Sequence, residues 1–156
     1  MVGIIIGLFG AAFSALGFAL MFRVRKRHLF VIGFGGLLSY AVYIPVQYFF
    51  GGEFFPNLAA AIVTAVFAEL CAHTLRAPVQ IYLIPMLIPL FPGGFLYYTM
   101  YHLLSSEYVL FTKNLLFTLE AAFALSGGMI IGLSVTTGFL SIFSRMRWKK
   151  CEKAKK

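Results

Sequence analysis

The sequence predicts an all-α integral membrane protein with about five transmembrane helices, the fourth of which is broken by proline and glycine. Of its 156 residues, 61% are hydrophobic and 12% are charged, and the mean hydropathy is +0.91. A soluble domain would carry about 25% charged residues. Several nearly charge-free stretches reach the length of about 18 residues or more that a membrane-spanning helix needs. We therefore expect a chain surrounded by a lipid bilayer.

Basic residues gather at the ends of the hydrophobic runs. One cluster occupies residues 23–28, after the first run, and a second occupies the tail at residues 145–156. Lys and Arg are enriched in the cytoplasmic segments of membrane proteins. We therefore expect the N-terminus outside and the C-terminus inside the cell. This topology and contact with anionic lipids explain the net charge of +8, so nucleic acid is not an expected partner.

The hydrophobic runs predict one transmembrane domain over residues 1–156. Its last run is too long for one perpendicular crossing, so it must tilt or extend past the membrane. Two five-helix halves joined in series have opposite orientations, as in many secondary transporters. We expect this chain to supply one such half. The spans are expected at about residues 2–22, 29–50, 57–75, 79–104 and 114–144, followed by a basic cytoplasmic tail at 145–156.

Small residues line one face of the first span and mark the fifth. In lipid, residues with little side chain let helices approach one another closely. Two interpretations remain open, namely general helix packing and a sliding surface for a moving helix. The residues are Gly3, Gly7, Gly10, Ser14 and Gly17 in the first span, and the GxxxG pair Gly128 and Gly132 in the fifth.

The second span carries a narrow polar face. Gly36, Tyr40, Tyr43 and Gln47 recur at helical spacing. We expect Tyr40 and Gln47 to line a substrate pathway. A role in the aromatic belt at the membrane surface is the alternative, and it suits Tyr48 better than the deeper Tyr40.

The third span contains three ionisable residues at steps of four and three, namely Glu69, His73 and Arg76. This spacing places them on one helix face. A carboxylate within a membrane normally faces a cavity or a partner. We therefore expect Glu69 to be a proton or cation site, with His73 as a relay and Arg76 at the cytoplasmic interface. A structural Glu69–His73 or Glu69–Arg76 pair is the alternative.

The fourth span contains Pro85, Pro89, Pro92, Gly93 and Gly94. Each proline removes a backbone donor and clashes with the preceding turn of a helix. In a membrane the freed backbone groups must find partners in the protein or line a water-filled cavity. The glycines permit a turn or a close backbone approach. These five residues therefore predict a broken helix that contributes to a substrate pathway.

A second half-helix is expected to begin near Phe95. Its first N–H groups and its dipole favour a carboxylate. Tyr97 and Tyr98 place further hydroxyl groups beyond the break, so we include them in the pathway. A kinked helix that only improves packing is the alternative.

In the fifth span, Glu120 lies near the predicted outer end. An external gate that admits a cation is one interpretation of this residue, and a glutamate at the membrane interface is the other.

No residue pattern typical of catalysis occurs. The chain has no Asp and no nucleophile-elbow, HExxH or P-loop motif. Cys71 and Cys151 have no metal-ligand spacing. We therefore expect neither an enzyme nor a cofactor or metal site.

The third and fourth spans together resemble the threonine/serine exporter family (ThrE-like). A Glu-x6-Arg-x-Pro segment ending at Pro78 precedes a Pro-Leu-x-Pro-Gly core at residues 89–93. The chain is similar to the short membrane subunit of the split, two-component form in its length, expected spans and basic tail. By motif position, the resemblance implies functional roles for Glu69, Arg76, Pro78, Pro85, Pro89, Pro92, Gly93 and Gly94.

The resemblance also implies a secondary exporter in the bacterial inner membrane. Its partner would be a larger five-span subunit with a cytoplasmic N-terminal domain. We expect a subunit of a proton-motive-force-driven exporter of small carboxylate metabolites, threonine and serine first. A dicarboxylate (succinate) exporter subunit is the alternative within this class, with Arg76 or His102 for the second carboxylate. A non-transporting membrane scaffold or regulator is the alternative from a different class.

Overall fold

The computed structural model describes the backbone of residues 2–153 and the side chains of residues 3–139. Within this part, every regular element is helical. The elements are α1 (Val2–Met21), α2 (Lys26–Phe50), α3 (Phe54–Leu75), α4 (Gln80–Leu87), the 3₁₀ helix η1 (Ile88–Leu90), α5 (Gly93–Leu104) and α6 (Tyr108–Lys153).

The predicted class of about five membrane-spanning helices agrees with this structure. In the described chain, α1, α2, α3 and α6 are each long and apolar enough to cross a membrane. The segments Gln80–Leu90 and Gly93–Leu104 pass the same test together, and they meet at a bend of 55°. The count is therefore four helices, or five if the bent pair is one span. The orientation of the termini remains a prediction.

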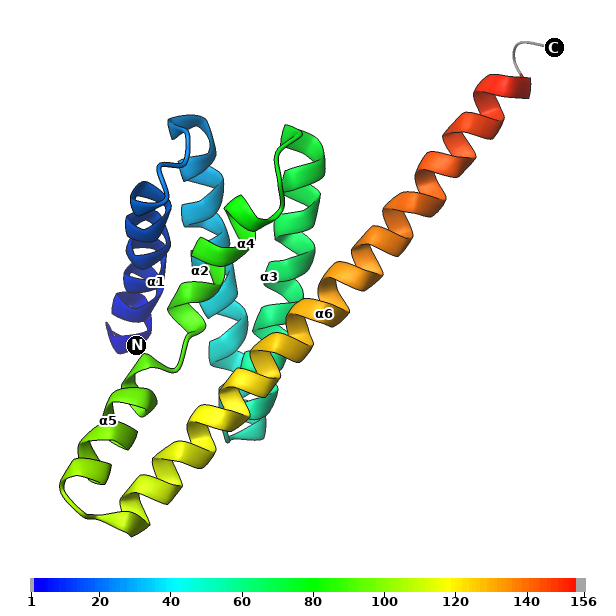
Figure 1. Ribbon diagram of the computed structural model, residues 1–156. Helices are drawn as coiled ribbons and strands as arrows, with labels where there is room; N and C mark the ends of the chain where they lie inside the picture. Colours follow the sequence, from blue (N-terminus) through cyan, green and yellow to red (C-terminus); the bar gives the residue numbers. More distant parts are fainter. Residues whose placement is uncertain (1, 154–156) are drawn as a thin grey trace.

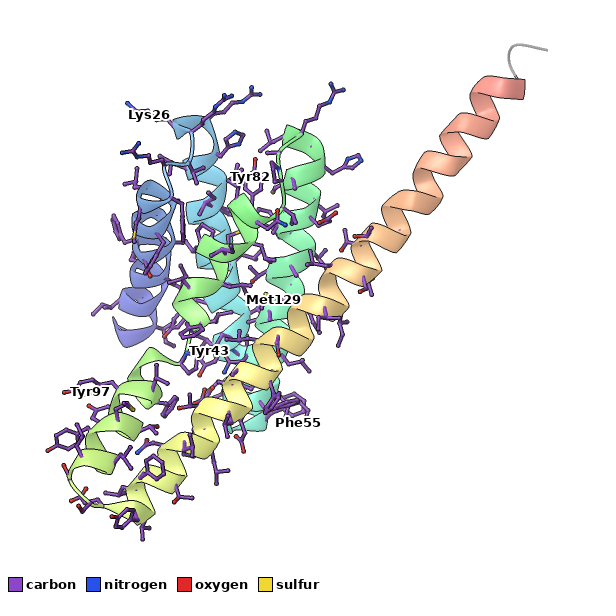
Figure 2. The ribbon with its side chains drawn as sticks, viewed as in Figure 1. Lys26, Tyr43, Phe55, Tyr82, Tyr97 and Met129 are labelled. Carbon is purple, nitrogen blue, oxygen red and sulfur yellow. The ribbon has the colours of Figure 1, made fainter. Side chains whose placement is uncertain are left out.

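The helices form a bundle with two unlike ends (Figure 1). The α1–α2 and α3–α4 loops lie together at one end, which we call the arginine end because Arg23, Arg25 and Arg76 lie there. The α2–α3 turn lies at the other end. Lys26 and Phe55 mark these two ends in Figure 2. The α5–α6 hairpin extends beyond the α2–α3 end, and α6 crosses the bundle diagonally.

Small residues bring α1 and α2 together. Ala15 is fully buried, and a Cβ added at Gly36 would lie 2.6 Å from the Cβ of Ala15. The glycine face expected on α1 contributes less than its pattern indicates. Gly7 lies against Tyr40, but a Cβ at Gly10 would meet nothing within 4 Å. The alanines of α1 therefore make the close contact with α2 that was predicted for its glycines.

The GxxxG pair of α6 packs against α3. A Cβ at Gly128 would lie 2.6 Å from the Cβ of Ala61, and one at Gly132 would lie 2.7 Å from the Cβ of Ala65. Added Cβ atoms at both glycines would also come within 2.8 Å of backbone oxygens of α3. These contacts support the packing interpretation, because small residues let backbones meet closely in lipid.

Three helices begin earlier than expected, and the first of them is α2, which starts at Lys26 rather than near residue 29. α3 begins at Phe54 rather than near residue 57, and Pro56 lies in its first turn, where the missing N–H has no intrahelical partner to lose. α6 begins at Tyr108 rather than near residue 114. The side chains of the predicted basic tail at 145–156 lie outside the described residues.

The segment formed by α4 and η1 fills the space between α1, α2 and α3. Tyr82 and Met86 are fully buried there. The sulfur of Met86 would lie 2.4 Å from a Cβ at Gly35, so this glycine makes room for α4. The first half of the broken segment is therefore part of the core, whereas α5 lies outside it (Figure 1).

Candidate functional site

A cavity of about 340 Å³ adjoins the break in the fourth span. We call it the break cavity. Its walls come from α2, the α2–α3 turn, α3, η1, the break itself and α5. Five predicted pathway residues line it, and Tyr43, Glu53 and Asn57 line it with them; the five are Tyr40, Pro89, Pro92, Gly94 and Tyr98.

The break is a tight turn at Pro92. This residue has φ −76° and ψ 50°, and the N–H of Gly93 donates to the carbonyl of Phe91 at 2.7 Å. This i→i+2 bond is an inverse γ-turn. α5 begins at Gly93, two residues before the predicted start at Phe95, and no side chain caps it. Its first N–H groups are therefore not covered by a capping side chain.

The two glycines after the break have a different role from the one predicted. Neither Gly93 nor Gly94 has positive φ, and a Cβ at either would meet nothing within 4 Å. The turn therefore does not require glycine, and no described segment approaches these residues closely. What the glycines do is keep the N-terminus of α5 free of side chains next to the cavity.

A hydrogen-bonded polar cluster forms another part of the lining. The hydroxyl of Tyr43 donates to Oε2 of Glu53 at 3.0 Å. Nδ2 of Asn57 donates to the backbone oxygen of Glu53 at 2.7 Å, and it lies 3.4 Å from Oε2. Asn57 is 2% exposed, and its Oδ1 is buried with no hydrogen-bond partner among the described residues. A buried acceptor left unpaired costs about 1–3 kcal/mol, so this atom is suited to receive a donor from a ligand.

Sequence reasoning missed Glu53 and Asn57 as site residues. The predicted spans left 51–56 between two helices and began the third span at Asn57. The actual turn is short, and Gly51 and Gly52 have φ 62° and 67°, a left-handed conformation that favours glycine. A signal was present, because Glu53 and Asn57 lie four residues apart and therefore share a face at the start of an otherwise apolar helix.

The polar face of α2 is only partly in the cavity. Tyr40 stacks on Tyr43 with ring centroids 5.9 Å apart, and both rings line the break cavity. Gln47 does not line it, although its Oε1 is buried and unpaired within the described structure. On α5, Tyr98 lines the cavity, whereas Tyr97 is 65% exposed and points away from the bundle (Figure 2).

The structure does not bring the predicted ion-coupling residues into one cluster. Arg76 ends α3 in the left-handed conformation, with φ 51° and ψ 49°, so it leaves the helix face that Glu69 and His73 define. His73 is exposed and Glu69 is partly buried. Among the described side chains, the one ion pair joins His102 and Glu107 at 2.7 Å, so the alternative of a structural Glu69 pair is not observed.

Glu120 is exposed on α6 and does not line the break cavity. Pro85 is buried inside α4, where it faces a different space. The prolines of the fourth span therefore line two different cavities, Pro89 and Pro92 the break cavity and Pro85 another one.

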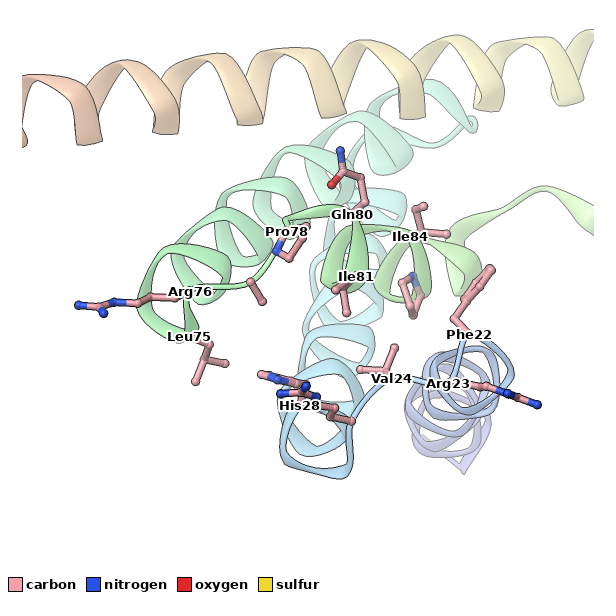
Figure 3. A pocket seen from close by; sticks show the side chains of 13 residues that line it. Phe22, Arg23, Val24, His28, Leu75, Arg76, Pro78, Gln80, Ile81 and Ile84 are labelled. Atoms are coloured by element: carbon pink, nitrogen blue, oxygen red, sulfur yellow. The ribbon is translucent and has the colours of Figure 1, made fainter.

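A second cavity of about 670 Å³ lies at the arginine end (Figure 3). We call it the arginine-end cavity. Leu75, Ile81, Ile84 and two prolines, Pro78 and Pro85, are among its apolar lining residues. Three arginines, His28 and Gln80 are its polar ones. The side chains of Arg23 and Arg76 extend away from its centre, as Figure 3 shows.

His28 also lines the arginine-end cavity, and its Nδ1 lies 2.6 Å from the hydroxyl of the buried Tyr82. This pair joins the start of α2 to α4. It therefore holds the first half of the broken segment against the bundle.

The comparisons with known proteins agree with the resemblance noted above. The family model of the threonine/serine exporter ThrE matches residues 7–135, which include the break and the polar cluster. No curated protein and no solved structure matches the chain. The matched region covers most of the sequence and contains the apolar helices. The chain therefore belongs to the threonine/serine exporter ThrE family, and it is a multi-pass membrane protein of the transporter type.

Proposed function

We propose that this chain is the membrane subunit of a secondary-active exporter of threonine and serine, driven by the proton motive force. The break cavity is the observation that carries the proposal. It combines a helix break at an apolar span with a polar cluster contributed by two other helices. Discontinuous membrane helices commonly form the substrate sites of secondary transporters.

The N-terminus of α5 is the proposed carboxylate site. Gly94 lines the cavity and presents backbone without a side chain. The positive end of the α5 dipole and its first N–H groups favour an anion there. The cavity volume of about 340 Å³ suits a small metabolite, because pockets for drug-sized ligands extend over about 300–1,000 Å³.

The distribution of charge supports the proposed topology. Arg23, Arg25 and Arg76 lie at the arginine end, whereas Glu53 and Glu107 lie in the turns at the other end. The positive-inside rule assigns the arginine end to the cytoplasm of a bacterial inner membrane, with the N-terminus outside and the C-terminus inside. The break cavity then lies toward the outer side.

A larger five-span subunit with a cytoplasmic N-terminal domain is the proposed partner. Phe91 and Leu96, beside the break, are 65% and 50% exposed. In the proposed assembly, the partner covers this region and closes the remaining side of the break cavity. Lipid covers the other apolar faces of the helices.

Glu69 is the proposed ion-coupling residue. It is partly buried within a membrane-spanning helix and makes no ion pair with the described side chains. Carboxylates in this setting mark proton and ion pathways. His73 and Arg76 follow toward the proposed cytoplasmic end, and Glu120 on α6 is the proposed cation-access residue.

Dicarboxylate export is the second candidate. The arginine-end cavity favours it, because Arg76 stands at the rim of a space large enough for such a substrate. Glu53 in the break cavity opposes it, since a second carboxylate there would be repelled.

Transport by cells that contain the chain and its partner tests the proposal. We expect export of threonine and serine that collapses when the proton motive force is dissipated. Gly94→Leu should lower export by about tenfold or more, because the new side chain enters the cavity mouth while the fold has room for it.

Gly17→Leu is the matched control, because a Cβ there also meets nothing within 4 Å and the position lies away from the break cavity. Succinate export without threonine or serine export would contradict the proposal and favour the second candidate.

A further inference from the structure

The polar cluster of Tyr43, Glu53 and Asn57 offers the break cavity hydrogen-bond acceptors and a negative charge. The hydroxyl of Tyr43 donates a hydrogen bond to Glu53, and the amide NH₂ of Asn57 donates to the same residue. The orientation of the Asn57 amide follows from its partners, because both are oxygens that only accept. Oδ1 of Asn57 must therefore face away from Glu53.

Two oxygens of this cluster have no hydrogen-bond partner among the described residues. Oδ1 of Asn57 is buried without a partner, and Oε1 of Glu53 receives no hydrogen bond from the described residues. Both residues line the cavity. Asn57 lies on α3 and is 2% exposed, so the surrounding residues fix the position of its amide group.

From this arrangement we propose that Glu53 and Asn57 bind the ammonium group of an amino-acid substrate. An ammonium group supplies three N–H donors and a positive charge, which match the two free oxygens and the carboxylate. Tyr43 acts as a positioning residue, because its hydroxyl fixes the Glu53 carboxylate. This inference rests on the proposed function. It adds an explanation of why the exporter would prefer amino acids to other carboxylates.

The cavity then has two ends of opposite preference. The N-terminus of α5 at Gly94 favours a carboxylate, and Glu53 favours a cation. A zwitterionic α-amino acid carries one charged group suited to each end. A dicarboxylate would place a second negative charge beside Glu53, where like charges repel. The charges of the cavity thus favour amino acids over dicarboxylates.

Substrate binding to the exporter, purified with its partner into liposomes, tests the inference. L-threonine is compared with 3-hydroxybutyrate, which lacks only the ammonium group, and with succinate. We expect the wild-type protein to bind threonine in preference to both. Glu53→Gln should weaken threonine binding by about tenfold or more and leave competition by 3-hydroxybutyrate unchanged or improved.

Two further variants guard against misfolding. Glu53 makes no side-chain cap on α3, so the isosteric Gln should not disturb the helix start. Glu53→Asp keeps the charge and should retain part of the threonine preference. Glu107→Gln is the matched control, because it removes a carboxylate from a turn outside the cavity.

Three results would overturn the inference. Unchanged threonine binding in Glu53→Gln would remove the ammonium role while leaving the proposed function intact. An equal loss for threonine and 3-hydroxybutyrate would point to a structural role, and competition of sodium alone with threonine at this site would point to a metal-cation site. A wild-type protein that binds neither threonine nor serine would reject the proposed function itself.

Discussion

The break cavity and the arginine-end cavity differ more in chemistry than in size. The arginine-end cavity is larger, about 670 Å³ against about 340 Å³, and its lining combines apolar side chains with three arginines, His28 and Gln80. The break cavity holds a carboxylate, a buried amide and two tyrosines. A ligand site needs a few convergent polar groups, and those of the two cavities differ in charge, basic at the arginine end and acidic at the break.

The two cavities also form in different ways. At the arginine end, Arg23 and Arg76 close two loops in left-handed conformations, with φ 54° and 51°. The break cavity forms because Pro92 turns the chain and α5 leaves the bundle at a bend of 55°. Loop closure produces the first cavity, and interruption of a helix produces the second.

Helix α3 connects the two regions. Asn57 lies at the break cavity and Arg76 at the arginine end. Glu69 lies twelve residues from the first and seven from the second, or about 18 Å and about 10 Å at 1.5 Å per residue. The proposed ion-coupling carboxylate thus lies between the proposed substrate site and the end that we propose to be cytoplasmic.

Disrupting the contact between α3 and α6 should have the largest effect, because α3 lines both cavities and α6 packs along it. Gly132→Leu forces side-chain atoms into Ala65 and the Ile62 carbonyl. We expect a loss of more than about 3 kcal/mol in stability, at or beyond the upper range for overpacking. Accumulation in membranes and thermal unfolding measure it.

Gly127→Ala is the matched control for this change, because its Cβ would make only an ordinary contact at 3.8 Å. Normal accumulation of Gly132→Leu would show that α6 is not held by this face.

Glu69→Gln should have the next largest effect. The neutral amide cannot carry a proton, so we expect threonine export to lose its dependence on the pH gradient and to fall by about tenfold or more. Threonine binding should stay near the wild-type level, because Glu69 does not line the break cavity. Transport in proteoliposomes with imposed gradients separates the two quantities. Export that keeps its full pH dependence would reject the coupling role.

Tyr43→Phe should have a moderate effect confined to the break cavity. It removes the hydroxyl that donates to Glu53 at 3.0 Å and preserves the ring stack with Tyr40. We expect threonine affinity to fall by about three- to tenfold, because a hydrogen bond to a charged group contributes about 1.5–3 kcal/mol and this one is only partly buried. Binding titration measures the change.

Tyr48→Phe provides the comparison for Tyr43→Phe, since Tyr48 is 86% exposed and makes no described hydrogen bond. Equal effects of the two variants would mean that the Tyr43 hydroxyl does not position the Glu53 carboxylate.

Arg23→Gly should have the smallest effect and tests the arginine-end cavity. The left-handed conformation of Arg23, with φ 54°, disfavours a side chain, so glycine should raise stability by about 0.5–1 kcal/mol. Threonine export should change by less than about twofold if the break cavity is the substrate site. A strong loss of export in a stable variant would assign substrate binding to the arginine end.

Composition and helical patterns predicted much of this molecule. The charge-free runs predicted the apolar helices, the proline and glycine positions predicted the break, and the motif order predicted the family. Each of these properties depends on residues close together in the chain. The residues at which helices end were harder to predict. The turn at Gly51 and Gly52, for example, depends on local backbone conformation that composition does not specify.

The predicted ion-coupling set shows the same limit. Steps of four and three place residues on one face only while the helix continues, and Arg76 lies where α3 ends in a left-handed residue. Glu69 and His73 keep their helical relation, but Arg76 joins a different part of the structure. Helical periodicity therefore predicted the relative positions of Glu69 and His73 correctly, but not that of Arg76.

What the sequence determined by itself is the class of the protein, its membrane setting and the location of its broken span. Only the tertiary structure decided what faces that break. Glu53 and Asn57 lie more than 30 residues before Pro92 in the chain, and they meet it because small residues let α2, α3 and α4 pack closely. Contacts between distant segments depend on the packing of whole helices, whereas a sequence pattern reports neighbours along one helix.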